Sequence, residues 1–251
     1  MTWRKWAMLT LALAIVAGTA GCLGGGDDDD DSAVPAVAAK LGTAVVTGKV
    51  VFKGKAPVEP IIQMGGDATC KAQHATAVSD PAVIVNKNGT LQNTFIYVKD
   101  GAGTYAAPKD PVALVQQGCM YHPHVFGIMV GQPLQIKNAD PTLHNIHAMP
   151  VTNDGFNVGQ PTQGMVSEKV FKKSEVMVKF KCDVHGWMNC YGGVVTNPFY
   201  AVTGDDGAFK LDKLPAGKYT VEAWHEKYGA QTFQIEVKDG EIKSQDVTFG
   251  Q

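Results

Sequence analysis

Short strands, rather than helices, are what the hydrophobic pattern of this chain predicts. Runs that alternate apolar and polar residues, or are rich in β-branched residues, recur from about residue 44 and are separated by Gly, Pro, Asn and Asp. Clear examples lie at 44–52, 94–98, 176–180 and 219–224. The one segment that could suggest a helix, 32–41, contains a proline and many small residues, so we expect it to be irregular. The chain is therefore predicted to be all-β.

The first residues have the pattern of an export signal. Arg4 and Lys5 precede an apolar stretch, 6–16, which is shorter than the roughly 20 residues of a membrane-spanning helix. Small residues and a cysteine follow, so we expect a signal peptide at 1–21. The small-small-Cys ending resembles the lipobox of bacterial lipoproteins, which implies that Cys22 is lipidated. Thr19 departs from the usual Leu, Val or Ile of that motif, so ordinary cleavage that leaves a free Cys22 stays open.

A flexible acidic tether is predicted at 22–43. Three glycines are followed by an uninterrupted aspartate run, 27–31, whose charges repel one another and cannot pack. Arg4 in the signal is the sole arginine of the sequence. The mature chain would lack guanidinium contacts to phosphate, so nucleic-acid binding is not expected.

The part of the chain after the tether divides by composition into three segments. We interpret 44–90 as an N-terminal β segment and 91–198 as a central domain rich in His, Cys, Met and aromatic residues. The last segment, 199–251, carries most of the remaining turn signals. The candidate chemistry lies in the central domain.

The strongest chemical signal is a Cys-x2-His-x2-Met motif formed by Cys182, His185 and Met188. It follows an alternating strand, and its donors are soft or borderline metal ligands. Three donors from one loop leave a copper ion under-coordinated, so a fourth must come from elsewhere. His144 is the candidate and His147 the reserve, because both follow the predicted strand that precedes residue 138.

Two imidazoles, one thiolate and a weak axial thioether are the donor set expected of a blue-copper site. Zinc would favour more thiolates or a carboxylate. A binuclear copper centre would need a second cysteine between Cys182 and His185, whereas Cys190 lies beyond Met188. The alternative that Cys182 forms a disulfide and the histidines are surface residues stays open.

These motifs resemble the cupredoxin family, and among its members most closely the amicyanin and plastocyanin type. The Cys-x2-His-x2-Met loop, the His-Asn-Ile-His segment beginning at His144, and the Tyr-His-Pro and strand pattern at 121–134 occur in the family's order. The resemblance implies a Greek-key β-sandwich that binds one copper ion. It also implies that His144, Cys182, His185 and Met188 are the ligands. Asn145 would lie beside the copper-bound sulfur.

The C-terminal segment contains two turn signals, Asp-Gly at 206–207 and Pro-Ala-Gly at 215–217, which predict strands joined in hairpins. Its pattern resembles the carboxypeptidase regulatory-like (transthyretin-like) β-sandwich, and 45–57 is similar to the first strand of that family. The resemblance implies that the cupredoxin domain is inserted into this smaller sandwich. His225 and Glu226 are expected on the surface, without a catalytic role.

Three further cysteines have no role in the expected copper site. We favour a disulfide between Cys70 and Cys119, with Cys119–Cys190 as the rival.

Several residues near the predicted ligands stay unassigned. His122, His124 and His147 could form a second metal site but are more commonly surface residues. Trp187 could cover the copper or simply pack.

The sequence thus predicts an exported, lipid-anchored type 1 copper protein in the periplasm or at the cell surface. Its copper ion would alternate between Cu(I) and Cu(II), so that the protein exchanges one electron with an unidentified redox partner. That partner would dock near an exposed edge of His185. A single ligand set argues against an oxidase or nitrite reductase, so no enzymatic activity is expected. Copper delivery and a non-redox surface scaffold are the alternative functions.

Overall fold

The computed structural model describes residues 39–250. The predicted signal peptide (1–21), Cys22 and most of the tether lie outside the described residues and stay predictions. Within the described part the chain consists of strands and one five-residue helix, which confirms the prediction of an all-β protein. In that same part, no helix has the length and apolar character needed to cross a membrane.

The strands are short and separated by turns, as the pattern of the sequence predicts. The predicted strands at 44–52, 94–98, 176–180 and 219–224 correspond to β1 (Ala44–Phe52), β2 (Phe95–Asp100), β10 (Glu175–Lys181) and β14 (Gly217–His225). The helix α1 was not expected, because five residues carry too little periodicity to be recognised. Along the described residues the order is β1 (Ala44–Phe52), α1 (Ala68–Ala72), β2 (Phe95–Asp100), β3 (Val112–Gln117), β4 (Met120–His122), β5 (Val125–Met129), β6 (Pro133–Asn138), β7 (His144–Met149), β8 (Phe156–Gln160), β9 (Val166–Val170), β10 (Glu175–Lys181), β11 (Asn189–Val195), β12 (Tyr200–Val202), β13 (Ala208–Leu214), β14 (Gly217–His225), β15 (Gly229–Val237), β16 (Ile242–Ser244) and β17 (Val247–Phe249).

Strands β3 to β11 form two sheets, which we call the central sandwich. One sheet has the order β4-β3-β6-β9 and the other β5-β11-β10-β7-β8. Neighbouring strands are antiparallel except for the pairs β3–β6 and β5–β11, which are parallel. Leu134 and Ile136 on β6 are buried at alternate positions and share one apolar core with Phe126 and Phe180. Burial of alternate side chains therefore explains the alternating pattern of this strand.

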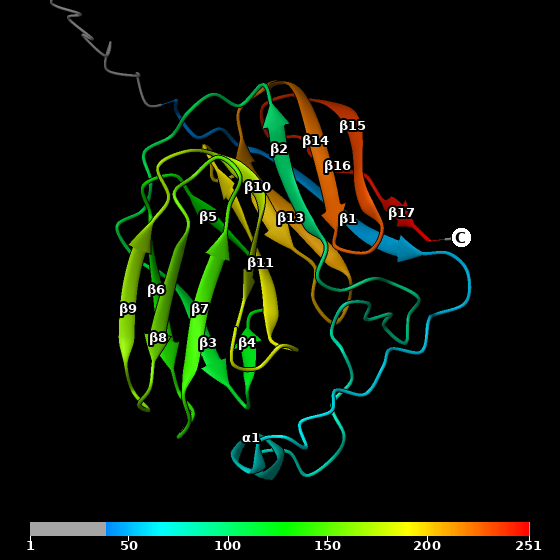
Figure 1. Ribbon diagram of the computed structural model, residues 1–251. Helices are drawn as coiled ribbons and strands as arrows, with labels where there is room; N and C mark the ends of the chain where they lie inside the picture. Colours follow the sequence, from blue (N-terminus) through cyan, green and yellow to red (C-terminus); the bar gives the residue numbers. More distant parts are fainter. Residues whose placement is uncertain (1–38, 251) are drawn as a thin grey trace, which may run out of the picture. The chain divides into compact units, whose positions relative to one another are not determined.

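The remaining strands form a second sandwich, which we call the outer sandwich. Its sheets have the orders β13-β1-β16, with β17 also paired to β1, and β12-β2-β14-β15. Figure 1 shows β1, in blue, among the orange and red C-terminal strands. The central sandwich is inserted between β2 and β12. The predicted boundary at residue 91 is wrong by one strand, because β2 pairs with β12 and β14 rather than with the central sandwich.

The two predicted turns near the C-terminus are present, but they do not join hairpins. β12 pairs with β2, β13 with β1, and β14 with β2 and β15. The three strands that flank the two turns, β12, β13 and β14, therefore alternate between the two sheets. At the first turn Gly207 has φ of +65°, and a Cβ there would lie 2.2 Å from Thr90. The turn residues mark where a strand ends, whereas burial of its apolar face decides which sheet the next strand joins.

Two glycines allow the outer sandwich to approach the central one closely. Gly127 on β5 and Gly193 on β11 are directly paired neighbours. A Cβ on Gly127 would lie 2.3 Å from the ring of Tyr200, and a Cβ on Gly193 would lie 2.4 Å from the ring of Phe95. Phe95 and Tyr200 come from β2 and β12, so aromatic rings of one sandwich rest on bare backbone of the other.

Candidate metal centre

Two neighbouring strands of the central sandwich carry the predicted ligands. His144 is the first residue of β7, and Cys182 directly follows β10. The two strands are antiparallel, with Lys181 opposite His147. The beginning of β7 and the end of β10 therefore meet at one end of the sheet, which brings His144 to the loop after β10.

Hydrogen bonds fold that loop back on itself. The backbone N–H of Cys182 donates to the carbonyl of Met188 at 3.0 Å, and that of Met188 donates to the carbonyl of His185 at 2.9 Å. The backbone N–H of His185 lies 3.4 Å from Sγ of Cys182 and donates to it. The three-residue spacing between these ligands matches this closed loop.

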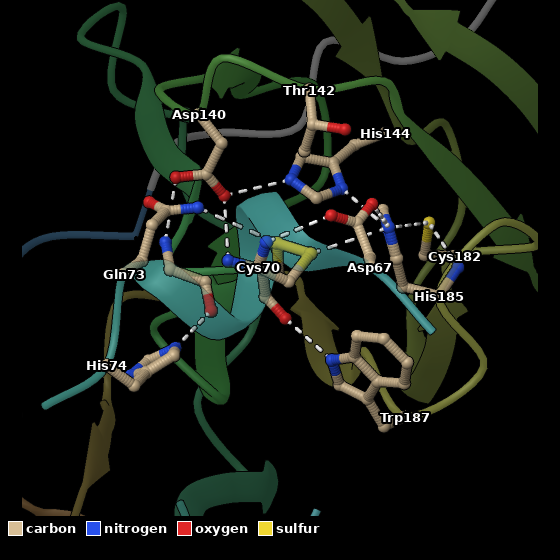
Figure 2. Close-up of a disulfide and its surroundings, with 12 residues drawn as sticks. Asp67, Cys70, Gln73, His74, Asp140, Thr142, His144, Cys182, His185 and Trp187 are labelled. Carbon is tan, nitrogen blue, oxygen red and sulfur yellow. Dashed lines mark hydrogen bonds and ion pairs between the residues drawn. A yellow bond between two sulfur atoms is a disulfide. The ribbon is translucent and has the colours of Figure 1, made fainter. Parts of the chain in front are cut away.

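The side chains of His144, Cys182 and His185 converge in one buried place (Figure 2). Nδ1 of His144 lies 3.0 Å from Nδ1 of His185, which lies 3.8 Å from Sγ of Cys182. The three residues are 0%, 2% and 3% exposed in the order of the chain. Met188 is fully buried in the same loop and shares its apolar cluster with Cys182. All four predicted ligands thus lie in two buried segments that meet at one end of the sheet, namely the start of β7 and the loop after β10.

Each of the two imidazoles has a carboxylate on its outer side. Nε2 of His144 lies 2.9 Å from Oδ2 of Asp140, and Nε2 of His185 lies 3.1 Å from Oδ2 of Asp67. A carboxylate only accepts hydrogen bonds, so each Nε2 carries the hydrogen and each Nδ1 of a neutral ring presents a lone pair. In neutral rings of this tautomer, the two Nδ1 atoms, which lie 3.0 Å apart, would both present lone pairs beside Sγ of Cys182.

The electrostatics of the site favour a neutral His144 and a charged Asp67. Burial lowers the pKa of His144, and although Asp140 raises it, His185 lowers it again. The pKa of Asp67 is lowered, first by the hydrogen bond from the backbone of Cys70 and next by that from His185. A neutral imidazole is the form that binds a metal.

These residues fit a copper ion. Facing lone pairs repel each other unless a cation or a proton lies between them, and a cation there would also contact Cys182. Two imidazole nitrogens, a thiolate and a nearby thioether are the donors that suit copper in a blue-copper site. Carboxylates that hold the far nitrogen of a ligating histidine fix its tautomer and raise its basicity.

Asn145 ties the two ligand segments together beside the sulfur. Its Oδ1 accepts a hydrogen bond from the backbone N–H of Asp183 at 2.6 Å and lies 3.3 Å from Sγ of Cys182. Its backbone carbonyl accepts one from the hydroxyl of Tyr121 at 2.5 Å. The place of Asn145 is therefore the one that the resemblance implied, next to the cysteine sulfur.

The structure contains a disulfide between Cys70 and Cys119, the pairing favoured from the sequence. Cys190, which the rival pairing would have used, is a free and fully buried cysteine of the central core. Burial raises the pKa of the Cys190 thiol well above its usual range. Cys182 is the other free cysteine in the described residues.

The expected exposed edge of His185 is a wrong prediction. The residue is 3% exposed, because Asp67 and Cys70 cover its Nε2 and the ring of Trp187 lies 5.1 Å from its own. Trp187 also donates through Nε1 to the carbonyl of Cys119 at 3.0 Å. Asp67 and Cys70, which cover His185, come from the segment around α1, more than 100 positions away in the chain. No motif spacing in the sequence indicated this contact. Asp140 could have been suspected, since it stands four residues before His144.

The histidines left unassigned do not come together. His147 faces Asp183 at 3.0 Å and His122 faces the carbonyl of Gln117 at 3.2 Å, whereas His124 contacts Glu226. Each therefore has a separate partner, and the described residues hold no second metal site built from them.

His225 and Glu226 do not lie on the surface as expected. His225 is fully buried against the rings of Tyr228 and Phe249, and the side chain of Glu226 is 8% exposed. The last residues of β14 and its turn pack inward, where Glu226 meets His124 of the central sandwich. A buried acid needs a partner, and only the insertion of one sandwich into the other supplies it.

Comparison with known proteins yields no matching family model and no matching curated protein. Solved structures that match include a copper-containing nitrite reductase from Thermus scotoductus (22% identity, TM-score 0.33, 40% of this chain) and a purple cupredoxin from Nitrosopumilus maritimus (24% identity, TM-score 0.29, 33% of this chain). An amicyanin variant in its Cu(I) form matches at 14% identity with a TM-score of 0.31 over 39% of this chain. The matches cover 25% of the reductase but 97% of the purple cupredoxin and of amicyanin. The assignment of function therefore depends on the site itself.

Proposed function

We propose that this chain is a mononuclear type 1 copper protein that carries single electrons between redox partners. The observation that carries the proposal is the convergence of Nδ1 of His144, Nδ1 of His185 and Sγ of Cys182 in one buried site. Met188 would supply the weak axial thioether. When bound, copper would supply a one-electron couple between Cu(I) and Cu(II).

The residues around the site would hold the ligands in place while the charge of the metal changes. Asp140 and Asp67 orient the two imidazoles, and Asn145 connects the segment of His144 to the loop of Cys182. Ligands held at both ends rearrange little, which suits outer-sphere electron transfer. We propose no catalysis, because an oxidase or nitrite-reductase role would need a further catalytic copper with histidines of its own.

The test is a visible absorption and electron paramagnetic resonance spectrum of the full chain loaded with Cu(II). An intense thiolate-to-copper band with a narrow copper hyperfine splitting is expected. Both should disappear in Cys182→Ser. The matched control is Cys190→Ser, which removes the other free thiol of residues 39–250, outside the candidate ligand set, and should keep both features.

A weak spectrum that Cys182→Ser leaves unchanged would contradict the proposal. In that event, copper that leaves rapidly to a chelator would favour delivery, and failure to bind copper would favour a scaffold. His144→Ala examines the ligand that comes from the other segment and should abolish the blue band as well.

We also propose that the protein is exported and anchored by a lipid on Cys22, so that it works at a membrane in the periplasm or at the cell surface. The support is the sequence of residues 1–31. Cys22→Ala in the bacterial host should move the protein from the membrane fraction to the soluble fraction. Unchanged membrane association would contradict the anchor without affecting the copper site.

A further inference from the structure

The segment between β1 and β2 closes the metal centre from outside the central sandwich. It places Asp67 and α1 over His185, whose Nε2 lies 3.1 Å from Oδ2 of Asp67 and 3.5 Å from Sγ of Cys70. We propose that Asp67 is a positioning residue, fastened by the disulfide, that holds the imidazole of His185 and keeps its outer edge away from solvent and partners. This inference rests on the proposed copper function.

Both oxygens of Asp67 are engaged. Oδ1 accepts a hydrogen bond from the backbone N–H of Cys70 at 3.0 Å, as the N-cap of α1, while Oδ2 faces His185. The carboxylate therefore has one orientation, and its charge is directed at the ring. The corresponding carboxylate behind His144, Asp140, comes from the same segment as that histidine, whereas Asp67 belongs to a separate part of the chain.

Further contacts fasten this segment to the central sandwich besides those with His185. The disulfide joins Cys70 to Cys119, and Nε2 of His74 lies 2.7 Å from the carbonyl of Gly118. Nε2 of Gln73 lies 3.7 Å from Sγ of Cys119. Figure 2 shows these contacts on the side of His185 that faces away from Cys182. The covalent bond between this segment and the central sandwich keeps Asp67 at the ring without relying on the metal.

Two measurable properties follow for the copper-loaded protein. A negative charge behind His185 stabilises Cu(II) more than Cu(I), because the interaction grows with the charge of the ion. It should therefore lower the reduction potential. A ring that cannot swing outward should also keep its ligand bond, so that copper leaves slowly.

The first test is Asp67→Asn in the full copper-loaded chain. Asparagine is a good N-cap, so α1 keeps its first hydrogen bond while the charge behind His185 is lost. Voltammetry should show a higher potential, and excess bicinchoninate should remove Cu(I) about 10- to 100-fold faster. The control is Asp80→Asn, which removes the same charge from the same segment. The side chain of Asp80 accepts a hydrogen bond from the backbone N–H of Ala82 and does not contact His185.

The second test separates the fastening from the charge. Cys70→Ser with Cys119→Ser keeps Asp67 but frees its segment, and it should also speed the loss of Cu(I) about 10-fold or more. In the metal-free protein, nitrogen-15 imidazole spectra should show His185 with its hydrogen on Nε2. The preference of the hydrogen for Nε2 should weaken in Asp67→Ala. This measurement needs no copper.

The outcomes distinguish this inference from the copper function. If the wild type shows the blue-copper spectrum and a reversible couple, but Asp67→Asn keeps the wild-type potential and release rate, the positioning role is overturned and the copper function stands. Unchanged His185 spectra in Asp67→Ala would overturn it in the same way. Absence of the spectrum in the wild type would overturn the proposed function instead.

Discussion

Asp140 links His144 to the disulfide. Its Oδ2 lies 2.9 Å from Nε2 of His144 and accepts a hydrogen bond from the backbone N–H of Cys119 at 2.7 Å, while Oδ1 accepts one from Gly118 at 2.8 Å. Asp140 is fully buried, so no water can take its place as the hydrogen-bond acceptor for these groups. One carboxylate thus determines both the tautomer of a ligand and the course of the loop that carries Cys119.

Asp140→Ala should therefore weaken both stability and copper binding. Loss of the acceptor leaves buried N–H groups unpaired, at a cost of about 1–3 kcal/mol each. Copper affinity should fall about 10- to 100-fold, because the tautomer of His144 is no longer fixed. Urea unfolding and competition with a copper chelator measure the two effects. Asp212→Ala, at an exposed position of β13, is the control and should change neither.

Removal of the disulfide should destabilise the protein without abolishing the fold. The bond closes a loop of 49 residues, for which the chain-entropy model gives about 4 kcal/mol. Cys70→Ser with Cys119→Ser should lower the free energy of unfolding of the metal-free protein by about that amount. Both sandwiches keep their cores, so the circular dichroism spectrum should remain that of strands. Loss of the strand signal would show that the disulfide is needed to form the central sandwich.

His225 should make stability depend on pH in a defined window. Burial lowers its pKa from 6.5 to about 4, against a smaller opposing effect of Glu226. Between these values the unfolded chain binds a proton that the folded one refuses, so stability falls as the pH drops from 6.5 to 4. The shift corresponds to about 3 kcal/mol at most.

His225→Gln, which does not titrate, measures that contribution. Urea unfolding at pH 7 and at pH 4 should show a smaller loss of stability on acidification for the variant than for the wild type. His122→Gln, which changes an exposed histidine, is the control and should keep the wild-type loss. Equal losses in His225→Gln and the wild type would show that His225 is not shielded in the folded protein.

Gly193→Ala should disturb the junction of the two sandwiches. The added Cβ would lie 2.4 Å from the ring of Phe95, so the ring or the strand must shift, at a cost of about 1–3 kcal/mol. Gly159→Ala is the matched control, because Gly159 also lies in a strand of the central sandwich and a Cβ there meets no atom within 4 Å. Thermal unfolding of both variants checks the difference. Equal midpoints would mean that the sandwiches can separate without loss of stability.

The sequence by itself determined the local features of the protein. Alternation of apolar and polar residues marked strands such as β1 and β10, because a strand buried on one face repeats every two residues. The ligand spacing from Cys182 to Met188 could be read directly, because neighbours within a loop are brought together by the short chain between them. His144 was found by its chemistry and by the family that its segment resembles.

The tertiary structure decided which distant groups meet. Strand periodicity does not name a partner, so the place of β2 in the outer sandwich and the alternation of β12, β13 and β14 between sheets were missed. The cover of His185 by Asp67 and the burial of His225 were missed for the same reason. The contacts of β2 with β12 and of Asp67 with His185 join segments about 100 residues or more apart, and they form because burial of apolar faces brings whole sheets together. Local sequence therefore identified the candidate ligands, whereas packing of the two sandwiches and the disulfide decided how the candidate metal centre is enclosed.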